Sequence, residues 1–188
     1  WNLNAQTGSW SVDPGNNYVR NASFEADHRY VPTHIKPVQD QLTGWTSTVI
    51  LGNAISQDSL TSPVLNYFNT EADRKIVIGE KSLAITDKIK FNRKVSQTIS
   101  STSYIKLPDG YYRLSAMIRN SGAFANLSMY AHSKGRTFRY TITGENSSWK
   151  KITLEHIKVR KGKVEIGFLA EGEAGALWLV DDVALVRE

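Results

Sequence analysis

The stretch that decides the fold class is residues 112–119, which read YRLSAMIR. Its apolar residues Leu114, Ala116 and Ile118 fall on one face of an extended strand, because successive side chains of a strand point to opposite faces. The turn sequence Pro108-Asp109-Gly110 comes just before it. We therefore predict a strand here with one face toward a core and the other toward solvent.

The same period-two pattern continues along the chain from residue 18 onward. The segments are enriched in β-branched and aromatic residues and are separated by Gly, Asn, Asp or Pro. The predicted strands are 18–25, 43–50, 75–86, 91–99, 110–119, 126–133, 136–143, 149–159, 163–170 and 176–187. About ten strands at roughly even spacing predict an all-β fold, an antiparallel β-sandwich or jelly roll.

A change in composition sets the predicted domain boundary. Residues 1–17 are polar and turn-rich, so we predict a lead-in or linker segment there, and residues 18–188 are the predicted β-sandwich domain. Two segments, 26–42 and 52–74, are too long for hairpin turns. Long loops on a rigid scaffold tend to carry function.

The overall composition is that of a soluble globular domain. The chain has 188 residues, 40% of them hydrophobic and 22% charged. It contains no stretch of ~18 apolar residues, so no membrane insertion is expected. The absence of cysteine excludes disulfides, thiolate metal sites and cysteine nucleophiles.

The net charge of +5 is compatible with two kinds of polyanion, nucleic acid and acidic polysaccharide. Basic residues are spread thinly, and no RRM, OB or helix-turn-helix signature is present. We therefore expect no nucleic-acid partner.

Catalytic motifs are also missing from the sequence. There is no GxSxG elbow, no HExxH and no phosphate-binding glycine loop, and the four histidines lack metal-ligand spacing. Acids in the long loops leave open a pair of catalytic carboxylates, and these are Asp27, Asp40, Asp58, Glu71 and Asp73. The main expectation is a non-enzyme, with a small glycan-active enzyme as the less favoured alternative.

An ordered set of short landmarks runs through the predicted sandwich. In chain order these are Asn21-Ala22-Ser23-Phe24-Glu25, Gly44-Trp45, Gly79-Glu80-Lys81-Ser82-Leu83, Val95-Ser96-Gln97-Thr98-Ile99, residues 107–116, Trp149, Gly167-Phe168 and Val180-Asp181-Asp182-Val183-Ala184-Leu185. In this order they resemble the galactose-binding-domain-like β-sandwich of carbohydrate-binding modules appended to glycoside hydrolases and polysaccharide lyases.

The resemblance implies a non-catalytic module that targets a polysaccharide-degrading enzyme to its glycan. The implied partners are a polysaccharide or oligosaccharide and a neighbouring catalytic domain, outside the cell or in the periplasm of a bacterium. An acidic or galactose-containing plant polysaccharide is the candidate glycan. The alternative is a structural accessory domain that binds no sugar.

The resemblance also implies a structural calcium that joins the first and last strands, with Glu25 and Asp181 as ligands. An ionised carboxylate in a buried strand is costly unless it is paired or bound to metal. Asp181 is expected to share a strand face with Val183 and Leu185. The alternative is that Asp181 is hydrogen-bonded or exposed, with no metal.

Two surfaces are candidates for sugar binding. On the loop rim the candidate residues are His28, Arg29, Tyr30, Tyr67, Phe68, Asn120 and Phe124. On an open sheet face Arg119, Tyr130 and His132 are expected to project together. We expect Trp45 and Trp149 to be core residues and not ligand contacts. For Tyr67-Phe68 the alternative is that one ring anchors the loop.

A basic run over the last third of the chain favours a uronate-rich polysaccharide. Its members are Lys150, Lys151, Lys158, Arg160, Lys161 and Lys163. The alternative is a solvated strand face.

Overall fold

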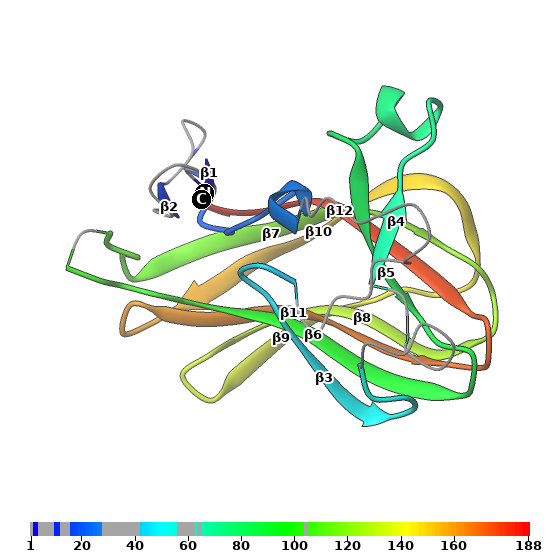
Figure 1. Ribbon diagram of the computed structural model, residues 1–188. Coiled ribbons are helices and arrows are strands. Elements are labelled where there is room, and N and C mark those ends of the chain that lie inside the picture. Colours follow the sequence, from blue (N-terminus) through cyan, green and yellow to red (C-terminus); the bar gives the residue numbers. More distant parts are fainter. Residues whose placement is uncertain are drawn as a thin grey trace.

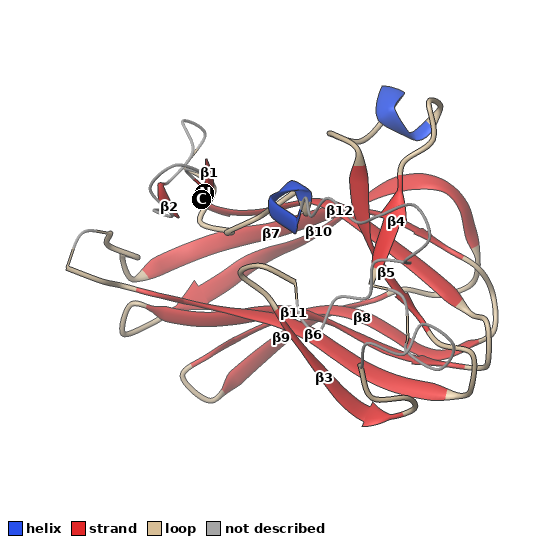
Figure 2. Ribbon diagram, viewed as in Figure 1, coloured by secondary structure: helices blue, strands red, loops and turns tan. Residues whose placement is uncertain are grey.

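The computed structural model describes residues 2–3, 10–11, 16–27, 42–55, 63, 65–103 and 105–188. Ten strands form two five-stranded antiparallel sheets that pack face to face (Figures 1 and 2). The first sheet has the order β10-β7-β12-β5-β4, and the second has the order β3-β6-β11-β8-β9. The β-sandwich predicted from the sequence is confirmed.

The strands of the first sheet are β4 (Asn66–Phe68), β5 (Lys81–Thr86), β7 (Gly110–Asn120), β10 (Asn146–Val159) and β12 (Leu177–Arg187). Those of the second are β3 (Thr46–Leu51), β6 (Phe91–Ser100), β8 (Phe124–Ser133), β9 (Arg136–Thr141) and β11 (Lys163–Gly172). A separate two-stranded pair joins β1 (Asn2–Leu3) to β2 (Trp10–Ser11). The 3₁₀ helices η1 (Glu25–Asp27) and η2 (Asp73–Lys75) are short, and no helix in the described part of the chain is long and apolar enough to cross a membrane.

The core lies between the two sheets and follows the predicted alternation. In β7, Leu114, Ala116 and Ile118 are fully buried, as predicted. Four aromatic rings cross the core in contact, with centroids 5.6 to 5.8 Å apart, and they are Phe24, Trp45, Phe168 and Trp178. Trp45 is thus a core residue, as expected.

One predicted strand is wrong and another is wrong in part. Residues 18–25 form no strand, because Asn21 and Phe24 have φ angles of 47° and 59°, which an extended chain does not adopt. The segment instead lies along β12 and is joined to it by isolated hydrogen bonds, such as the one that Tyr18 N–H donates to the Leu185 carbonyl at 3.1 Å. Of the predicted strand 75–86 only β5 is extended, and residues 66–68 of the expected loop form the edge strand β4.

Candidate functional site

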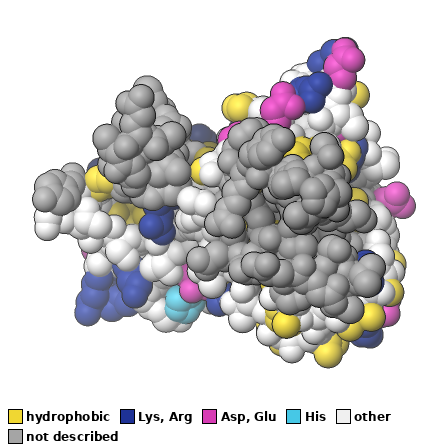
Figure 3. Space-filling model, viewed as in Figure 1, with side chains coloured by type: hydrophobic (Ala, Val, Ile, Leu, Met, Phe, Trp, Pro, Cys, Tyr) yellow, Lys and Arg dark blue, Asp and Glu magenta, His cyan; other side chains and the backbone are white. Residues whose placement is uncertain are grey.

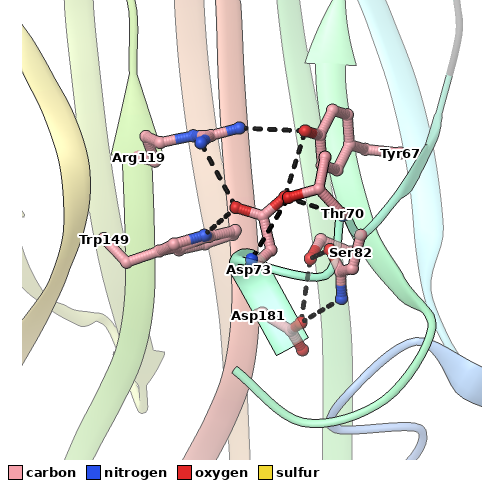
Figure 4. A network of polar contacts seen from close by, with 8 residues as sticks. Tyr67, Thr70, Asp73, Ser82, Arg119, Trp149 and Asp181 are labelled. Carbon is pink, nitrogen blue, oxygen red and sulfur yellow. Dashed lines mark hydrogen bonds and ion pairs between the residues drawn. The ribbon is translucent and has the colours of Figure 1, made fainter. Parts of the chain in front are cut away.

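The connection between β4 and β5 folds onto the outer face of the first sheet. Val77 N–H donates to the Asp73 carbonyl at 2.9 Å, and Asn69 N–H donates to the Glu80 carbonyl at 2.9 Å. These bonds bring η2 against side chains of β7 and β10, and only 3% of Asp73 remains exposed although it lies in a connection between two strands. Figure 4 shows Asp73 between Arg119 and Trp149 on one side and Tyr67 and Thr70 on the other.

Arg119 is the centre of this arrangement. Its guanidinium donates to Asp73 Oδ1 at 3.2 Å and to Tyr67 Oη at 3.1 Å. The guanidinium carbon lies 5.5 Å from the ring centroids of both Tyr67 and Trp149, within cation–π range. The side chain keeps 29% of its surface exposed, so the cation is oriented from several sides and still reaches solvent.

Asp73 joins the surrounding groups into one network. Oδ1 also accepts from Trp149 Nε1 at 2.8 Å, while Oδ2 accepts from the Thr70 amide and hydroxyl at 2.9 and 2.8 Å and from Tyr67 Oη at 3.1 Å. Burial alone would raise the pKa of Asp73, but the bonds from Trp149 and Thr70 and the charge of Arg119 lower it to about 2. We call Tyr67, Thr70, Asp73, Arg119 and Trp149 the Arg119 cluster.

Two members of the cluster, Tyr67 and Arg119, were predicted from the sequence as ligand contacts, and the fold brings them together. Asp73 was noted only as a loop acid. The prediction that Trp149 is core is wrong, because its ring is only partly buried and stacks with Arg119 on the outer face. No sequence signal links these residues, since Asp73 and Trp149 are 76 positions apart and meet only through the fold.

The other rim candidates are dispersed. Phe68 is 61% exposed and, as the strand neighbour of Tyr67, points to the opposite face, so one ring of the pair anchors the loop. Asn120 is buried and binds the Gly144 carbonyl at 2.9 Å. Phe124 is half-buried and packs edge-on against Phe91 at 6.1 Å. His28, Arg29 and Tyr30 lie outside the described residues.

The expected grouping of Arg119 with Tyr130 and His132 is wrong. Arg119 is in β7 of the first sheet, while the other two are in β8 of the second. The Tyr130 ring lies across Gly167, where any Cβ would come within 2.8 Å of it, and its hydroxyl donates to Glu165 Oε1 at 2.5 Å. Burial and the charge and hydrogen bond of Glu165 raise the pKa of Tyr130. Only 4% of this side chain is exposed, so the ring offers little surface for stacking on a sugar.

Asp181 faces the opposite way from the prediction. β12 pairs Asp181 with Met117 and Ala184 with Ser115, so two residues of β12 lie opposite one of β7 in a bulge. The bulge puts Asp181 on the outer face, whereas Val183 stays in the core. Asp181 is fully buried there beneath the β4–β5 connection and accepts from Ser82 Oγ at 2.8 Å.

Asp181 has a second acid, Asp182, beside it, and the charge of Glu25 acts on Asp182. Burial and the charge of Asp182 raise the pKa of Asp181 to about 8, although hydrogen bonds from the Asp182 amide, Ser82 and Asn69 oppose this. Asp182 Oδ1 is buried without a hydrogen-bond partner, and burial and the charge of Glu25 raise the pKa of Asp182. Within the described ranges no Lys or Arg forms an ion pair with these three acids, and no three Asp, Glu, His or Cys side chains form a ready-made metal centre.

Comparison with known proteins identifies the fold. No protein-family model matches the chain, and no curated protein matches it in sequence. The solved structure of TmCBM61 in complex with β-1,4-galactotriose is similar over 92% of this chain and 99% of that one, with 20% identity and a TM-score of 0.62. A CBM4 structure is similar over 90% and 99%, with 11% identity and a TM-score of 0.53.

The same sandwich occurs as part of a larger protein. The structure of the enzymatically active domain of tailspike protein 4 from bacteriophage CBA120 is similar over 90% of this chain and 21% of that one. The identity is 14% and the TM-score is 0.57. At these identities the likeness is one of fold. The chain therefore has the β-sandwich fold of carbohydrate-binding modules.

Proposed function

We propose that this chain is a non-catalytic carbohydrate-binding module and that the Arg119 cluster contacts the glycan. The observation that carries the proposal is a guanidinium held between two aromatic rings on the outer face of the sandwich and still 29% exposed. Aromatic faces pack on the C–H faces of sugars, and guanidinium N–H groups donate to hydroxyl oxygens. Likeness of fold to a module whose structure contains galactotriose supports this class of function.

Asp73 is suited to positioning and not to acid–base chemistry. A carboxyl group with a pKa of about 2 holds no proton near neutral pH, so it cannot act as a general acid. Both of its oxygens are occupied by hydrogen bonds that hold Arg119, Trp149 and Thr70 in place. The acid therefore supports a rigid binding surface.

In this proposal the module tethers a neighbouring catalytic domain to its polysaccharide, in an extracellular or periplasmic bacterial setting. Tethering raises the local concentration of the enzyme on the glycan without any new catalytic group.

The binding test compares variants of the cluster on β-1,4-galactan and on polygalacturonate by isothermal titration. Trp149→Ala and Arg119→Lys should each weaken binding about tenfold, because one removes a stacking surface and the other the planar donor fork. Tyr111→Ala is the matched control on galactan, since Tyr111 is a 49% exposed aromatic residue of β7 outside the cluster. Unchanged affinity in both cluster variants would exclude this site.

A second role, packing against a neighbouring domain, is favoured by a different observation. Phe68, Ile76 and Ile78 are 61%, 55% and 67% exposed around the β4–β5 connection. Exposed apolar side chains in one region are typical of interaction surfaces. A chain that binds no polysaccharide in the test above would have this structural role alone.

We further propose a structural calcium held by Glu25 and Asp181, with backbone carbonyls and water completing the oxygen ligands. Its chemistry would be to neutralise buried carboxylates.

Calcium should raise the melting temperature of chelator-treated protein, and Asp181→Asn should abolish the rise. Without calcium, Asp181→Asn should be at least as stable as the wild type, since it buries no charge. Asp109→Asn is the control, because it changes a surface carboxylate and should keep the rise in melting temperature with calcium. Absence of calcium binding and of any shift in melting temperature would refute the site.

A further inference from the structure

The two hairpin turns at one end of the sandwich enclose a small hollow. Its volume is about 210 Å³, and its lining residues are Ser133, Lys134, Arg136, Lys158 and Arg160. β9 and β10 are edge strands of the two sheets, so the hollow lies where the sheet edges meet. Lys and Arg side chains gather at the lower left of Figure 3, at the end of the molecule where the β8–β9 and β10–β11 turns lie in Figure 1. We call this site the basic hollow.

Two tight turns frame the hollow. Lys134 and Gly135 have φ angles of 44° and 75°, and Lys161 and Gly162 have φ angles of 56° and 58°, as in the tight turns that match strand twist. Ser133 Oγ accepts from Arg160 N–H at 3.0 Å and donates to the Lys163 carbonyl at 2.7 Å. One buried hydroxyl thus ties the two turns together and sets the spacing of their basic side chains.

Two of the four cations of the hollow lie against aromatic rings. The Arg136 guanidinium lies 5.0 Å from the Phe138 ring centroid, and Lys158 Nζ lies 5.4 Å from that of Tyr111. Among the described residues, none of the four forms an ion pair with a carboxylate. Aromatic rings attract a cation but leave its charge in place.

One carboxylate, Asp109, lies near the hollow without lining it. Asp109 Oδ1 accepts from Gly162 N–H at 3.0 Å. Hydrogen bonds from the Gly162 and Lys161 amides, and then the charges of Arg160 and Lys134, lower the pKa of Asp109. Four cations beside one carboxylate leave an excess of positive charge.

We infer that the basic hollow binds an anionic substituent of an acidic glycan, a carboxylate or a sulfate ester. The inference rests on the proposed function, because the glycan is the ligand class of the module. Guanidinium groups bind carboxylate and sulfate oxygens through paired, charge-assisted hydrogen bonds. A volume of about 210 Å³ is below the ~300–1,000 Å³ of pockets for whole ligands, so it suits one charged sugar residue.

The hollow is separate from the Arg119 cluster but lies along the same strand. Trp149 and Lys158 are both in β10, nine residues and about 30 Å apart. A single polysaccharide chain that reaches both sites gains affinity by multivalency.

The test measures the affinity of the full chain for polygalacturonate, dextran sulfate and neutral β-1,4-galactan, at low and high salt. The double variant Arg136→Gln/Arg160→Gln should weaken binding to an anionic glycan about tenfold or more and leave galactan binding unchanged. Lys150→Gln/Lys151→Gln is the matched control, because it removes the same charge from exposed residues at the other end of β10. Lys134→Asn is a milder variant, since Asn tolerates the left-handed turn position.

Each outcome separates the possibilities. Equal losses in the two double variants would show a response to net charge alone and would overturn the inference. Equally tight binding of a single-stranded oligonucleotide through the same arginines would assign the hollow to phosphate and overturn the glycan assignment. Two results together would support both sites. Galactan binding would be lost only in the Trp149→Ala and Arg119→Lys variants, and binding of the anionic glycan only in the Arg136→Gln/Arg160→Gln variant. Galactan binding that the cluster variants leave unchanged would refute the proposed cluster site, and anionic binding lost in the hollow variant would still leave the hollow standing.

Discussion

The Arg119 cluster and the basic hollow use the same pairing of cation and aromatic ring in opposite ways. Arg119 lies between Tyr67 and Trp149, and Arg136 lies over Phe138. The difference is Asp73, which neutralises Arg119 at 3.2 Å, whereas no described carboxylate pairs with Arg136. A ring only orients a cation, so the presence of an acid decides whether the cation is neutralised, and this is why we propose a neutral ligand for one site and an anion for the other.

The largest effect is expected from removing that acid. Asp73→Ala would leave Arg119 unpaired and remove the acceptor of Trp149, Tyr67 and Thr70, so it should lower the free energy of unfolding by about 3 kcal/mol. Urea denaturation measures this change. Glu71→Ala is the control, because its pair with Lys75 is exposed on both sides and is worth under ~1 kcal/mol. A loss as small as that of the control would show that Asp73 does not hold the cluster rigid.

The next effect is a pH dependence that belongs to the cluster. The pKa of Asp73 is about 2 when folded against 3.8 as its ordinary value, so its ionised form stabilises the fold above pH 4 by about 2 kcal/mol. This contribution is lost as the pH falls from about 4 to about 2. Denaturation curves of wild type and Asp73→Asn across this range should converge at low pH. Parallel curves would contradict the assignment.

The smallest effect tests the role of the ring in the hollow. Phe138→Leu keeps apolar bulk but removes the ring over Arg136, a contact worth about 0.5–1 kcal/mol. Affinity for polygalacturonate should fall two- to fivefold with no change in net charge. Phe68→Leu, an exposed ring of β4, should have no effect on it. Equal losses in both variants would indicate that Phe138 does not position Arg136.

The fold could be predicted from the sequence because its signal is local. Residues 112–119 alternate with period two, and their buried set, Leu114, Ala116 and Ile118, is the one that the pattern predicts. The prediction failed where the backbone leaves the strand region, as at Asn21 and Phe24, or where a bulge shifts the period, as at Asp181. Bulges and left-handed residues depend on tertiary contacts that a periodic pattern does not contain.

The candidate sites were predictable only in part. Tyr67 and Arg119 were identified as side chains of the right chemistry, but their meeting depends on a loop acid 46 positions from Arg119 and on a tryptophan expected in the core. Within the basic run, Lys158 and Arg160 line the hollow, while Lys150 and Lys151 lie at the other end of β10. Lys134 and Arg136, which complete the hollow, come from the β8–β9 hairpin.

By itself, the sequence determined that this protein is a β-sandwich with a positive charge, because strand periodicity and charge are properties of neighbouring residues and of composition. Only the tertiary structure decided which cations are neutralised, because ion pairs and ring contacts form between residues far apart in the chain. That difference separates the Arg119 cluster from the basic hollow, and with it the surface that we propose for a neutral sugar from the surface that we propose for an anion.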